Sequence, residues 1–300
     1  MNGLYGGIEA GGTKFICMVG SGPSDVVEEA RFDTTTPTNT IQHAIDFFRP
    51  YVSRNQLAAV GIAAFGPVDL DACSPTYGYI TTTPKPHWSQ VDLWGTVQRE
   101  LRLPVAFDTD VNAAAFGEQF WVPQREQLDP LLYMTVGTGI GVGVVVNGSP
   151  LHGLMHAEAG HCLLPHDRQS DPFDGVCPYH GDCLEGLASG LSMHRRWDRS
   201  PEKLPADHPG WKLEAEYLGK AITNLILTYS PRRIILGGGV SHHVGLHGAV
   251  RENVLKYLAG YLHSPMLDDR IDEYIGPPVL GNRSGALGAI ALAIQLTTKL

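Results

Sequence analysis

The sequence predicts an α/β protein, and three observations lead to this fold class. The chain of 300 residues is 43% hydrophobic and 18% charged, which is typical of a globular protein of one large or two ordinary domains. Short β-branched segments alternate with longer segments of helical periodicity. A segment rich in glycine and threonine near the start is weakly similar to a second segment near the middle of the chain. Together these features indicate mixed sheets covered by helices.

The expected elements follow the hydrophobic pattern along the chain. Strands are predicted at residues 15–20, 58–65, 105–108, 131–136, 141–146 and 233–236. Helices are predicted at residues 40–52, 94–101, 111–121, 184–197, 212–229, 248–261 and 284–296. The stretches 165–178 and 200–209 are rich in aspartate and proline, so both are expected to be loops.

The internal echo predicts two β-hairpins with glycine-lined turns. The segment GIEAGGTK at residues 7–14 is answered by TVGTGIG at residues 135–141, and each joins a strand-like run to a second strand. Neither segment has the spacing of a P-loop or of a dinucleotide fingerprint. Two such turns, one from each half of a duplicated chain, can offer backbone N–H groups to a polyphosphate. The sequence therefore predicts a nucleotide site between two lobes, and the alternative is that these are ordinary hairpin glycines.

A second constellation predicts a metal site. Cys177, His180 and Cys183 have the spacing C-x₂-H-x₂-C, and His161 supplies a fourth ligand upstream. Four such ligands complete a tetrahedron around Zn²⁺ and leave no position for water, so the ion is expected to be structural. The alternative is a chance grouping of surface histidines and buried cysteines.

The segment FDTDVNAAA at residues 107–115 is a third candidate. It is a strand end with two aspartates that opens directly into a helix. Asp110 or Asn112 could be a helix N-cap. The carboxyl ends of strands line the ligand crevice of an open α/β sheet, however, so a carboxylate there is also well placed to accept a substrate proton.

Composition excludes several classes of partner and suggests a compartment. With 22 Lys and Arg against 31 Asp and Glu, the formal net charge is −9, and no basic cluster suits a nucleic acid. No apolar run reaches the roughly 20 residues that a membrane span requires, and the start of the chain does not resemble a signal peptide. An odd count of 5 cysteines favours a reducing compartment, so a cytoplasmic protein is expected.

These motifs, taken in order, resemble the ROK (repressor, ORF, kinase) sugar kinases of the actin-like ATPase superfamily, and within them the fructokinase branch. The resemblance covers nearly the whole chain. The further segments that carry it are residues 65–69, 82–85, 158–161, 185–190 and 236–239. It implies the two-lobed actin-like (ribonuclease H-like) fold, with duplicated α/β lobes and a small zinc-binding segment. The expected lobes are residues 1–115, with the first phosphate loop and the catalytic aspartate, and residues 116–300, with the C-terminal helix returning to the first lobe.

The resemblance also implies roles for individual residues. Asp110 would be the catalytic base, and ATP would arrive with Mg²⁺, for which Glu9 could be a protein ligand. The residues implied in sugar binding are Gly66, Pro67, Glu158, His161 and Glu185, with His161 also binding zinc. The residues implied in nucleotide binding are Gly11, Gly12, Thr13 and Lys14 in the first phosphate loop, Gly137, Thr138 and Gly139 in the second, and Gly237, Gly238 and Gly239 beside the adenosine.

Two departures from the family pattern bear on the substrate. Many members have Asp where this chain has Glu9, and Asn where it has Thr109. These two residues and the Thr-Pro-Lys stretch together resemble the pattern of fructokinases more than that of glucokinases. The implied function is an ATP-dependent fructokinase, a phosphotransferase acting on an alcohol group, commonly a homodimer. The alternatives are a ROK kinase of glucose, mannose or an N-acetyl amino sugar, and a ROK sugar-sensing regulator, which would need a helix-turn-helix segment before the first phosphate loop.

Overall fold

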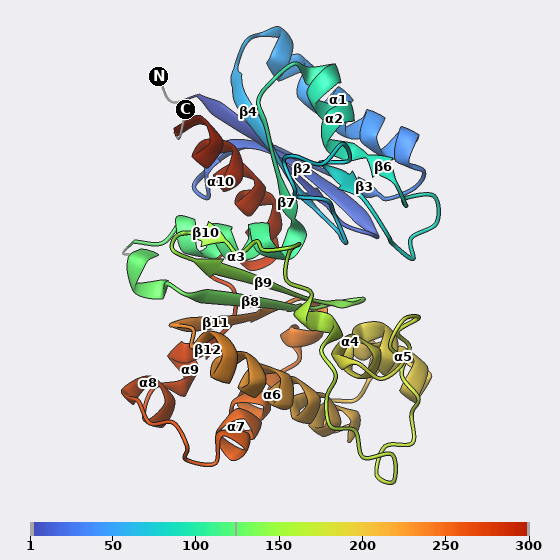
Figure 1. Cartoon of the computed structure of the whole chain (residues 1–300), viewed down its shortest axis with the longest axis vertical. Coiled ribbons are helices and arrows are strands. Elements are labelled where there is room, and N and C mark those ends of the chain that lie inside the picture. Colours follow the sequence, from blue (N-terminus) through green and yellow to red (C-terminus); the bar gives the residue numbers. More distant parts are fainter. Residues whose placement is uncertain (1–2, 124, 299–300) are drawn as a thin grey trace. The chain divides into compact units, whose positions relative to one another are not determined.

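A computed structural model describes residues 3–123 and 125–298 of the chain, and its two five-stranded sheets share one pattern of connections (Figure 1). The first sheet has the order β3-β2-β1-β4-β7, and the second has the order β10-β9-β8-β11-β12. In each sheet three consecutive strands lie side by side. Two later strands then add in parallel on the far side of the first of these three. The expected duplication is therefore present at the level of topology.

The strands have the following bounds. The first sheet contains β1 (Leu4–Ala10), β2 (Lys14–Gly22), β3 (Asp25–Asp33), β4 (Leu57–Ala64) and β7 (Val105–Thr109). The second contains β8 (Leu131–Val136), β9 (Ile140–Val146), β10 (Ser149–Pro150), β11 (Arg233–Gly237) and β12 (Ile275–Gly276). The short strands β5 (Tyr79–Ile80) and β6 (Val91–Asp92) pair with each other.

The helices follow the expected order with shifted ends. They are α1 (Pro37–Ser53), α2 (Leu93–Leu101), α3 (Asp110–Phe120), α4 (Leu184–Ala188), α5 (Gly190–Trp197), α6 (Gly210–Tyr229), α7 (Leu246–Leu258), α8 (Pro265–Asp268), α9 (Ile271–Tyr274) and α10 (Ser284–Thr298). Short 3₁₀ turns occupy Arg125–Leu128, Ala159–His161, Pro201–Lys203, Gly239–His242 and Gly281–Arg283. No helix in the described part of the chain is both long and apolar enough to cross a bilayer.

One predicted helix is wrong in a specific way. The helix expected at residues 184–197 is broken at Ser189, whose backbone is extended with φ −76° and ψ 162°. The Ser189 side chain accepts a hydrogen bond from the backbone N–H of Ser192 and so begins a new helix, α5. Serine favours a helix start over a helix interior because its hydroxyl competes for backbone partners.

The chain forms two compact units. Unit 1 consists of Met1–Glu126, Gly143–Ala157 and Val279–Leu300, and unit 2 of Gln127–Val142 and Glu158–Pro278. The boundary expected at residue 115 falls inside α3, and unit 1 also includes residues 143–157 and the C-terminal helix α10.

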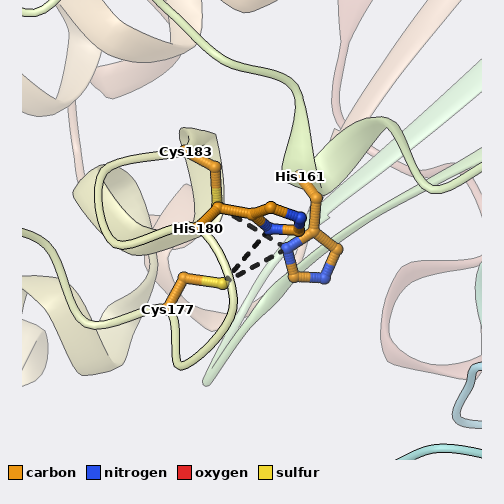
Figure 2. Close-up of side chains that lie close together, drawn as sticks. All are labelled: His161, Cys177, His180 and Cys183. Carbon is orange, nitrogen blue, oxygen red and sulfur yellow. Dashed lines mark hydrogen bonds between the residues drawn. The ribbon is translucent and has the colours of Figure 1, made fainter.

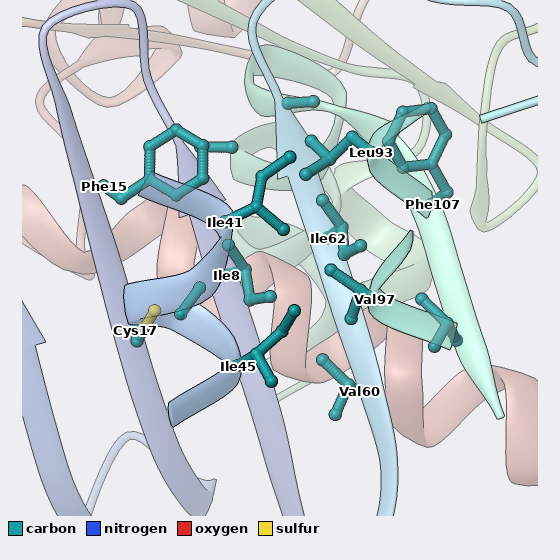
Figure 3. Close-up of a cluster of buried hydrophobic side chains, with 14 of the residues drawn as sticks. Ile8, Phe15, Cys17, Ile41, Ile45, Val60, Ile62, Leu93, Val97 and Phe107 are labelled. Carbon is teal, nitrogen blue, oxygen red and sulfur yellow. The ribbon is translucent and has the colours of Figure 1, made fainter. Parts of the chain in front are cut away.

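The core of unit 1 fills the space between its sheet and helices α1 and α2 (Figure 3). Ile8 and Ile62 from the sheet meet Ile41 and Ile45 from α1, and all four are buried. Burying such side chains stabilises a fold by about 1.5–3 kcal/mol each, which makes this layer the main support of the strands β1, β4 and β7.

Helix α10 covers the other face of this sheet at unusually short range. A Cβ on Gly61 of β4 would lie 1.8 Å from the carbonyl oxygen of Ala289, and a Cβ on Gly288 would lie 1.8 Å from that of Ala113 in α3. Only glycine permits these approaches. The strands and the helix that carry the candidate site of unit 1 are therefore packed on both faces.

Candidate active site

The turn expected to be the first phosphate loop lies between β1 and β2 in unit 1, and the predicted hairpin is confirmed by the antiparallel register of these strands. The backbone N–H of Gly11 donates to the carbonyl of Lys14 at 3.0 Å. Thr34 donates from its hydroxyl to the carbonyl of Gly11 at 2.6 Å, and its N–H donates to that of Thr13 at 2.9 Å. A Cβ on Gly12 would meet no atom within 4 Å. The turn is thus held in shape from behind, and Gly12 borders open space.

Glu9, the residue expected to bind magnesium, is a partly buried residue near the end of β1, and its Oε2 atom is buried. Its carboxylate packs against the first turn of α10, because a Cβ on Gly285 would lie 2.6 Å from its Cδ. Burial raises the pKa of Glu9, while nearby Lys14 opposes that shift. The Oε2 atom has no hydrogen-bond partner among the described residues. A buried carboxylate oxygen in that position suits a hard cation or its water.

Asp110 is the first residue of α3, and it is not the cap of that helix. The N-cap is Thr109, whose hydroxyl accepts from the N–H of Asn112 at 3.1 Å. The Oδ1 atom of Asp110 accepts from the N–H of Val111 at 2.8 Å. The alternative in which Asp110 or Asn112 caps the helix is therefore wrong, because a threonine hydroxyl already occupies that role.

Sequence reasoning missed Asp108, which is 2% exposed at the end of β7. Its Oδ1 atom accepts from the N–H of Thr109 at 2.7 Å and from the side-chain amide of Asn112 at 2.8 Å. Its Oδ2 atom accepts from Nε2 of His152 at 2.9 Å. That hydrogen bond raises the pKa of His152. The sequence signal was an acidic residue at an otherwise apolar strand position.

The segment with Gly66 and Pro67 follows β4 in unit 1, and its position is set by a second histidine. The N–H of Val68 donates to Nε2 of the buried His156 at 3.1 Å. Burial lowers the pKa of His156, which keeps its ring neutral and able to accept at this nitrogen. Sequence reasoning did not single out His156.

The turn expected to be the second phosphate loop lies in unit 2 between β8 and β9. The N–H of Gly190, at the start of α5, donates to the carbonyl of Gly137 at 2.8 Å, and the N–H of Ile140 donates to Oε2 of Glu185 at 2.9 Å. The N–H of Leu191 donates to the carbonyl of Thr138 at 3.3 Å. The break at Ser189 thus brings a helix start against this loop.

Gly139 and Gly137 differ in their surroundings. A Cβ on Gly139 would lie 2.5 Å from Oε2 of Glu185, whereas a Cβ on Gly137 would meet no atom within 4 Å. A substitution at Gly139 would therefore displace Glu185, which is one of the expected sugar-binding residues. Gly137 borders open space in the same way as Gly12.

The residues expected to bind sugar in unit 2 come together. Nε2 of His161 lies 4.0 Å from Oε1 of Glu185, and the N–H of His161 donates to the carbonyl of Glu158 at 3.0 Å. Burial of the Glu158 carboxyl, with the nearby Glu185 carboxylate, raises the pKa of Glu158 to about 7. These three side chains offer the carboxylate and imidazole groups that recognise sugar hydroxyls by hydrogen bonds.

His161, Cys177, His180 and Cys183 form the Cys/His cluster, and their ligand atoms all lie within 4.8 Å of one another (Figure 2). Sγ of Cys177 is 3.6 Å from Nδ1 of His161 and 3.5 Å from Nδ1 of His180, and Sγ of Cys183 is 3.5 Å from Nδ1 of His161. Zinc bonds of about 2.3 Å to sulfur and about 2.0–2.1 Å to nitrogen place these atoms about 3.5 Å apart in a tetrahedron. The four residues therefore fit a zinc ion.

The His161 ring joins the cluster to Glu185, one of the residues expected to bind sugar. Its Nδ1 atom faces the cysteine sulfurs, while its Nε2 atom faces Glu185. Burial raises the pKa of the Cys183 thiol to about 11, so a bound metal would have to displace its proton. A metal bound at Nδ1 would fix the direction of Nε2.

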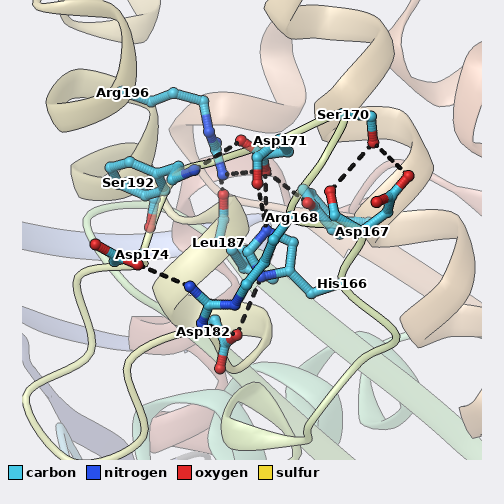
Figure 4. A network of polar contacts seen from close by, with 12 residues as sticks. His166, Asp167, Arg168, Ser170, Asp171, Asp174, Asp182, Leu187, Ser192 and Arg196 are labelled. Carbon is cyan, nitrogen blue, oxygen red and sulfur yellow. Dashed lines mark hydrogen bonds and ion pairs between the residues drawn. The ribbon is translucent and has the colours of Figure 1, made fainter.

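A polar network supports the loop that carries the cluster (Figure 4). Oδ2 of Asp171 accepts from Nη2 of Arg196 at 3.1 Å. The His166 ring spans from the carbonyl of Asp171, at 2.9 Å, to the carboxylate of Asp182, at 3.0 Å. The hydrogen bond from His166, with one from Arg168, lowers the pKa of Asp182. The chain between the ligands is thus held by charged hydrogen bonds where regular structure is lacking.

The three glycines expected beside the adenosine have different reasons to be glycine. Gly238 has φ +89°, and a Cβ there would lie 2.4 Å from the carbonyl oxygen of Val136. A Cβ on Gly237 would lie 2.4 Å from Oη of Tyr133. Only Gly239, which begins a 3₁₀ turn, borders open space. Packing inside unit 2 accounts for the first two, and Gly239 is the one left free to approach a ligand.

Comparison with known proteins gives consistent results over the whole chain. The model of the ROK family matches residues 5–296. The fructokinase of Streptococcus mutans is 40% identical over 100% of both chains. The fructokinase of Lactococcus lactis is 39% identical, also over 100% of both. The crystal structure of a ROK family glucokinase from Streptomyces griseus, in complex with glucose and AMPPNP, is 25% identical, has a TM-score of 0.76, and covers 98% of this chain and 100% of that chain.

Proposed function

This chain belongs to the ROK family, and we propose that it is an ATP-dependent fructokinase that converts D-fructose to fructose 6-phosphate. The observation that supports fructose as the substrate is the similarity to fructokinases along the full length of both chains. The site geometry is compatible with this reaction, since unit 1 holds a carboxylate at a strand end and each unit holds a glycine-lined turn beside open space.

In the proposed reaction Asp110 is the general base. The 6-hydroxyl oxygen of fructose attacks the γ-phosphorus of ATP, the bond from that phosphorus to the bridging oxygen breaks, and ADP leaves. The hydroxyl proton passes to the Asp110 carboxylate. The N–H of Val111 donates to Oδ1 of Asp110 at 2.8 Å, which would hold the carboxylate in a fixed direction at the start of α3. Phosphoryl transfer depends mainly on positioning, which the rigid start of α3 would supply.

The nucleotide would contact both glycine-lined turns. Gly11, Gly12, Thr13 and Lys14 in unit 1, and Gly137, Thr138 and Gly139 in unit 2, would approach the phosphates, and Gly239 with its two glycine neighbours would border the adenosine. Glu9 is the protein carboxylate placed to receive a magnesium ion or its water. Magnesium, when bound with ATP, neutralises the phosphate charge that develops during transfer.

The sugar would contact Gly66 and Pro67 in unit 1 and Glu158, His161 and Glu185 in unit 2. His161, Cys177, His180 and Cys183 would hold the zinc ion. Zinc, when bound, supplies a fixed point for the His161 ring and takes no part in bond breaking. Zinc would therefore shape the sugar site through one of its own ligands.

We also propose that the protein is a homodimer and is located in the cytoplasm. The family resemblance favours a homodimer, which sedimentation would test. The described chain holds 5 free cysteines and no disulfide, which suits a reducing cytoplasm.

The experiment that tests the function is a panel of hexoses with ATP, read by coupled ADP release. We expect fructose to give the highest kcat/KM, with glucose, mannose and N-acetyl amino sugars well below it. A preference for glucose would place the chain with the other ROK hexose kinases. No turnover with any hexose would refute the kinase proposal.

A further inference from the structure

Residues 143–157 of unit 1 form a support for the start of α3. Asn147 and Gly148, with φ of +54° and +67°, make the tight turn between β9 and β10. A Cβ on Gly143 would lie 2.0 Å from the carbonyl oxygen of Val111, so β9 touches the first turn of α3 directly. The following segment closes on itself through an antiparallel bridge between His152 and His156.

The two histidines of this bridge bind two different segments of the candidate site. His152 donates from Nε2 to the buried carboxylate of Asp108 at 2.9 Å. The same carboxylate accepts hydrogen bonds from the N–H of Thr109 and from the side-chain amide of Asn112. These two residues lie on either side of the Asp110–Val111 pair. His152 thus reaches the catalytic turn through one buried group.

His156 reaches the segment expected to contact the sugar. Its Nε2 atom accepts from the N–H of Val68, the residue after Pro67, so the ring proton belongs on Nδ1. Nδ1 lies 3.5 Å from the carbonyl of Ala157, which can accept that proton. The ring therefore has one tautomer that satisfies both contacts.

We propose that His152 and His156 are positioning residues for phosphoryl transfer, His152 acting on Asp110 through Asp108 and His156 acting on the Gly66–Pro67 segment through Val68. This inference rests on the proposed function, because it takes Asp110 as the base and Gly66 and Pro67 as sugar contacts. It assigns different kinetic effects to the two rings. Loss of His152 disturbs the base and lowers kcat, whereas loss of His156 disturbs sugar binding and raises the sugar KM.

The test compares His152→Phe and His156→Leu with two conservative variants. His152→Gln keeps a donor for Asp108, and His156→Gln keeps an acceptor for Val68. His263→Phe is the matched control, because His263 is also paired with an aspartate, Asp268, at 3.4 Å, but on an exposed part of unit 2. Melting temperature and zinc content are measured for each variant, together with kcat and KM for the hexose that the wild type uses best.

We expect His152→Phe to lower kcat by about 10- to 100-fold with little change in either KM, since displacing a catalytic group by about 1 Å can cost roughly 10²-fold. His156→Leu should raise the sugar KM by about tenfold, which is about 1.4 kcal/mol of binding, and leave the KM for ATP near the wild-type value. Each glutamine variant should recover most of the loss. In an Asp108→Asn background, His152→Phe should cost little more, because the two residues act in series.

Several results would overturn the inference. It fails if His152→Phe and His156→Leu match His263→Phe in kcat and KM, or if kcat and both KM values change together in proportion to lost stability. If His152→Phe or His156→Leu does not fold, the glutamine variant at the same position is measured in its place, and a folded glutamine variant with activity far below wild type overturns the inference, because glutamine restores the donor or acceptor assigned to the histidine. A wild type that turns over no hexose refutes the proposed function instead, which separates the two failures.

Discussion

Asp108 and Asp110 lie where a buried strand of unit 1 passes into a helix, whereas the Cys/His cluster of unit 2 lies in a segment that has almost no regular structure between β10 and α4. The turn that carries these two aspartates is held by hydrogen bonds that involve Thr109, Asn112 and His152. The cluster is formed by thiols and imidazoles that meet at one point. We therefore expect the first region to be stabilised by the fold itself, and the cluster to gain further stability from a bound metal ion.

This difference has a physical origin. Hydrogen bonds within a packed turn are satisfied as soon as the sheet and helix form, because their partners come with those elements. Four metal ligands brought to one point instead gain most of their stabilisation from the ion, which couples metal binding to folding. Unit 1 should therefore tolerate loss of metal, and the cluster segment of unit 2 should not.

The largest effect is expected from Cys183→Ala. Structural zinc has an apparent binding energy on the order of 10 kcal/mol in isolated fingers, which is comparable to the whole stability of many domains. We expect one zinc per wild-type chain, loss of zinc in the variant, and a strongly lowered melting temperature. Cys162→Ala is the matched control, because Cys162 is an exposed neighbour outside the cluster. Full zinc content with unchanged melting in Cys183→Ala would contradict the assignment.

Asp110→Asn should give the next largest effect, on rate alone. Asparagine keeps the size of the side chain and removes the proton acceptor, and the helix cap is unaffected because Thr109 provides it. We expect kcat to fall by about 10²–10⁴-fold, with sugar binding and melting temperature close to wild type. Steady-state kinetics and sugar titration measure both. Retention of more than about a tenth of wild-type turnover would overturn the proposed mechanism.

Gly12→Ala should affect the nucleotide and not the sugar. A Cβ there meets no protein atom within 4 Å, so folding is unaffected, but the methyl group would occupy space needed by a phosphate. We expect the KM for ATP to rise by at least about tenfold, or about 1.4 kcal/mol, with a nearly unchanged sugar KM. Gly248→Ala, another glycine beside open space, is the control. Equal changes in both KM values would argue against a phosphate contact.

Gly137→Ala makes the same test in unit 2. Gly139→Ala is less informative, because its Cβ would meet Glu185 and would disturb the expected sugar site together with the phosphate loop. If Gly137→Ala raises the KM for ATP as Gly12→Ala does, both turns approach the nucleotide. If only one of them does, the proposed symmetric role of the two hairpins is wrong.

The smallest effect concerns the pH dependence of the His152–Asp108 pair. The hydrogen bond that His152 donates to the Asp108 carboxylate raises the pKa of His152 above its ordinary value of about 6.5. The pair's contribution to stability is therefore fully present below about pH 6.5 and is lost as pH rises through the folded pKa. An NMR titration should find the raised pKa in the wild type and a lower one in Asp108→Asn. An unshifted His152 in the wild type would remove the electrostatic support for this pair.

Local pattern was sufficient to predict most of the regular elements and the residues of the Cys/His cluster. The strand predicted at residues 131–136 has the bounds of β8, and the first predicted hairpin is present, because alternating hydrophobicity and turn glycines act over a few residues. The spacing of Cys177, His180 and Cys183 likewise fixes three ligands on one turn. Strand β3 was missed because its residues are mostly exposed and charged, at the edge of the sheet.

The α/β class, the order of the elements, the glycine turns and three of the four cluster residues can be predicted from the chain alone, since each depends on neighbours a few positions apart. Three contacts are set by long-range packing: His152 meets Asp108, His156 meets Val68, and Glu185 accepts a hydrogen bond from the second glycine turn. These partners are 44, 88 and 45 residues apart. No local periodicity encodes a hydrogen bond over that distance, because its geometry exists only after the sheets and helices have packed.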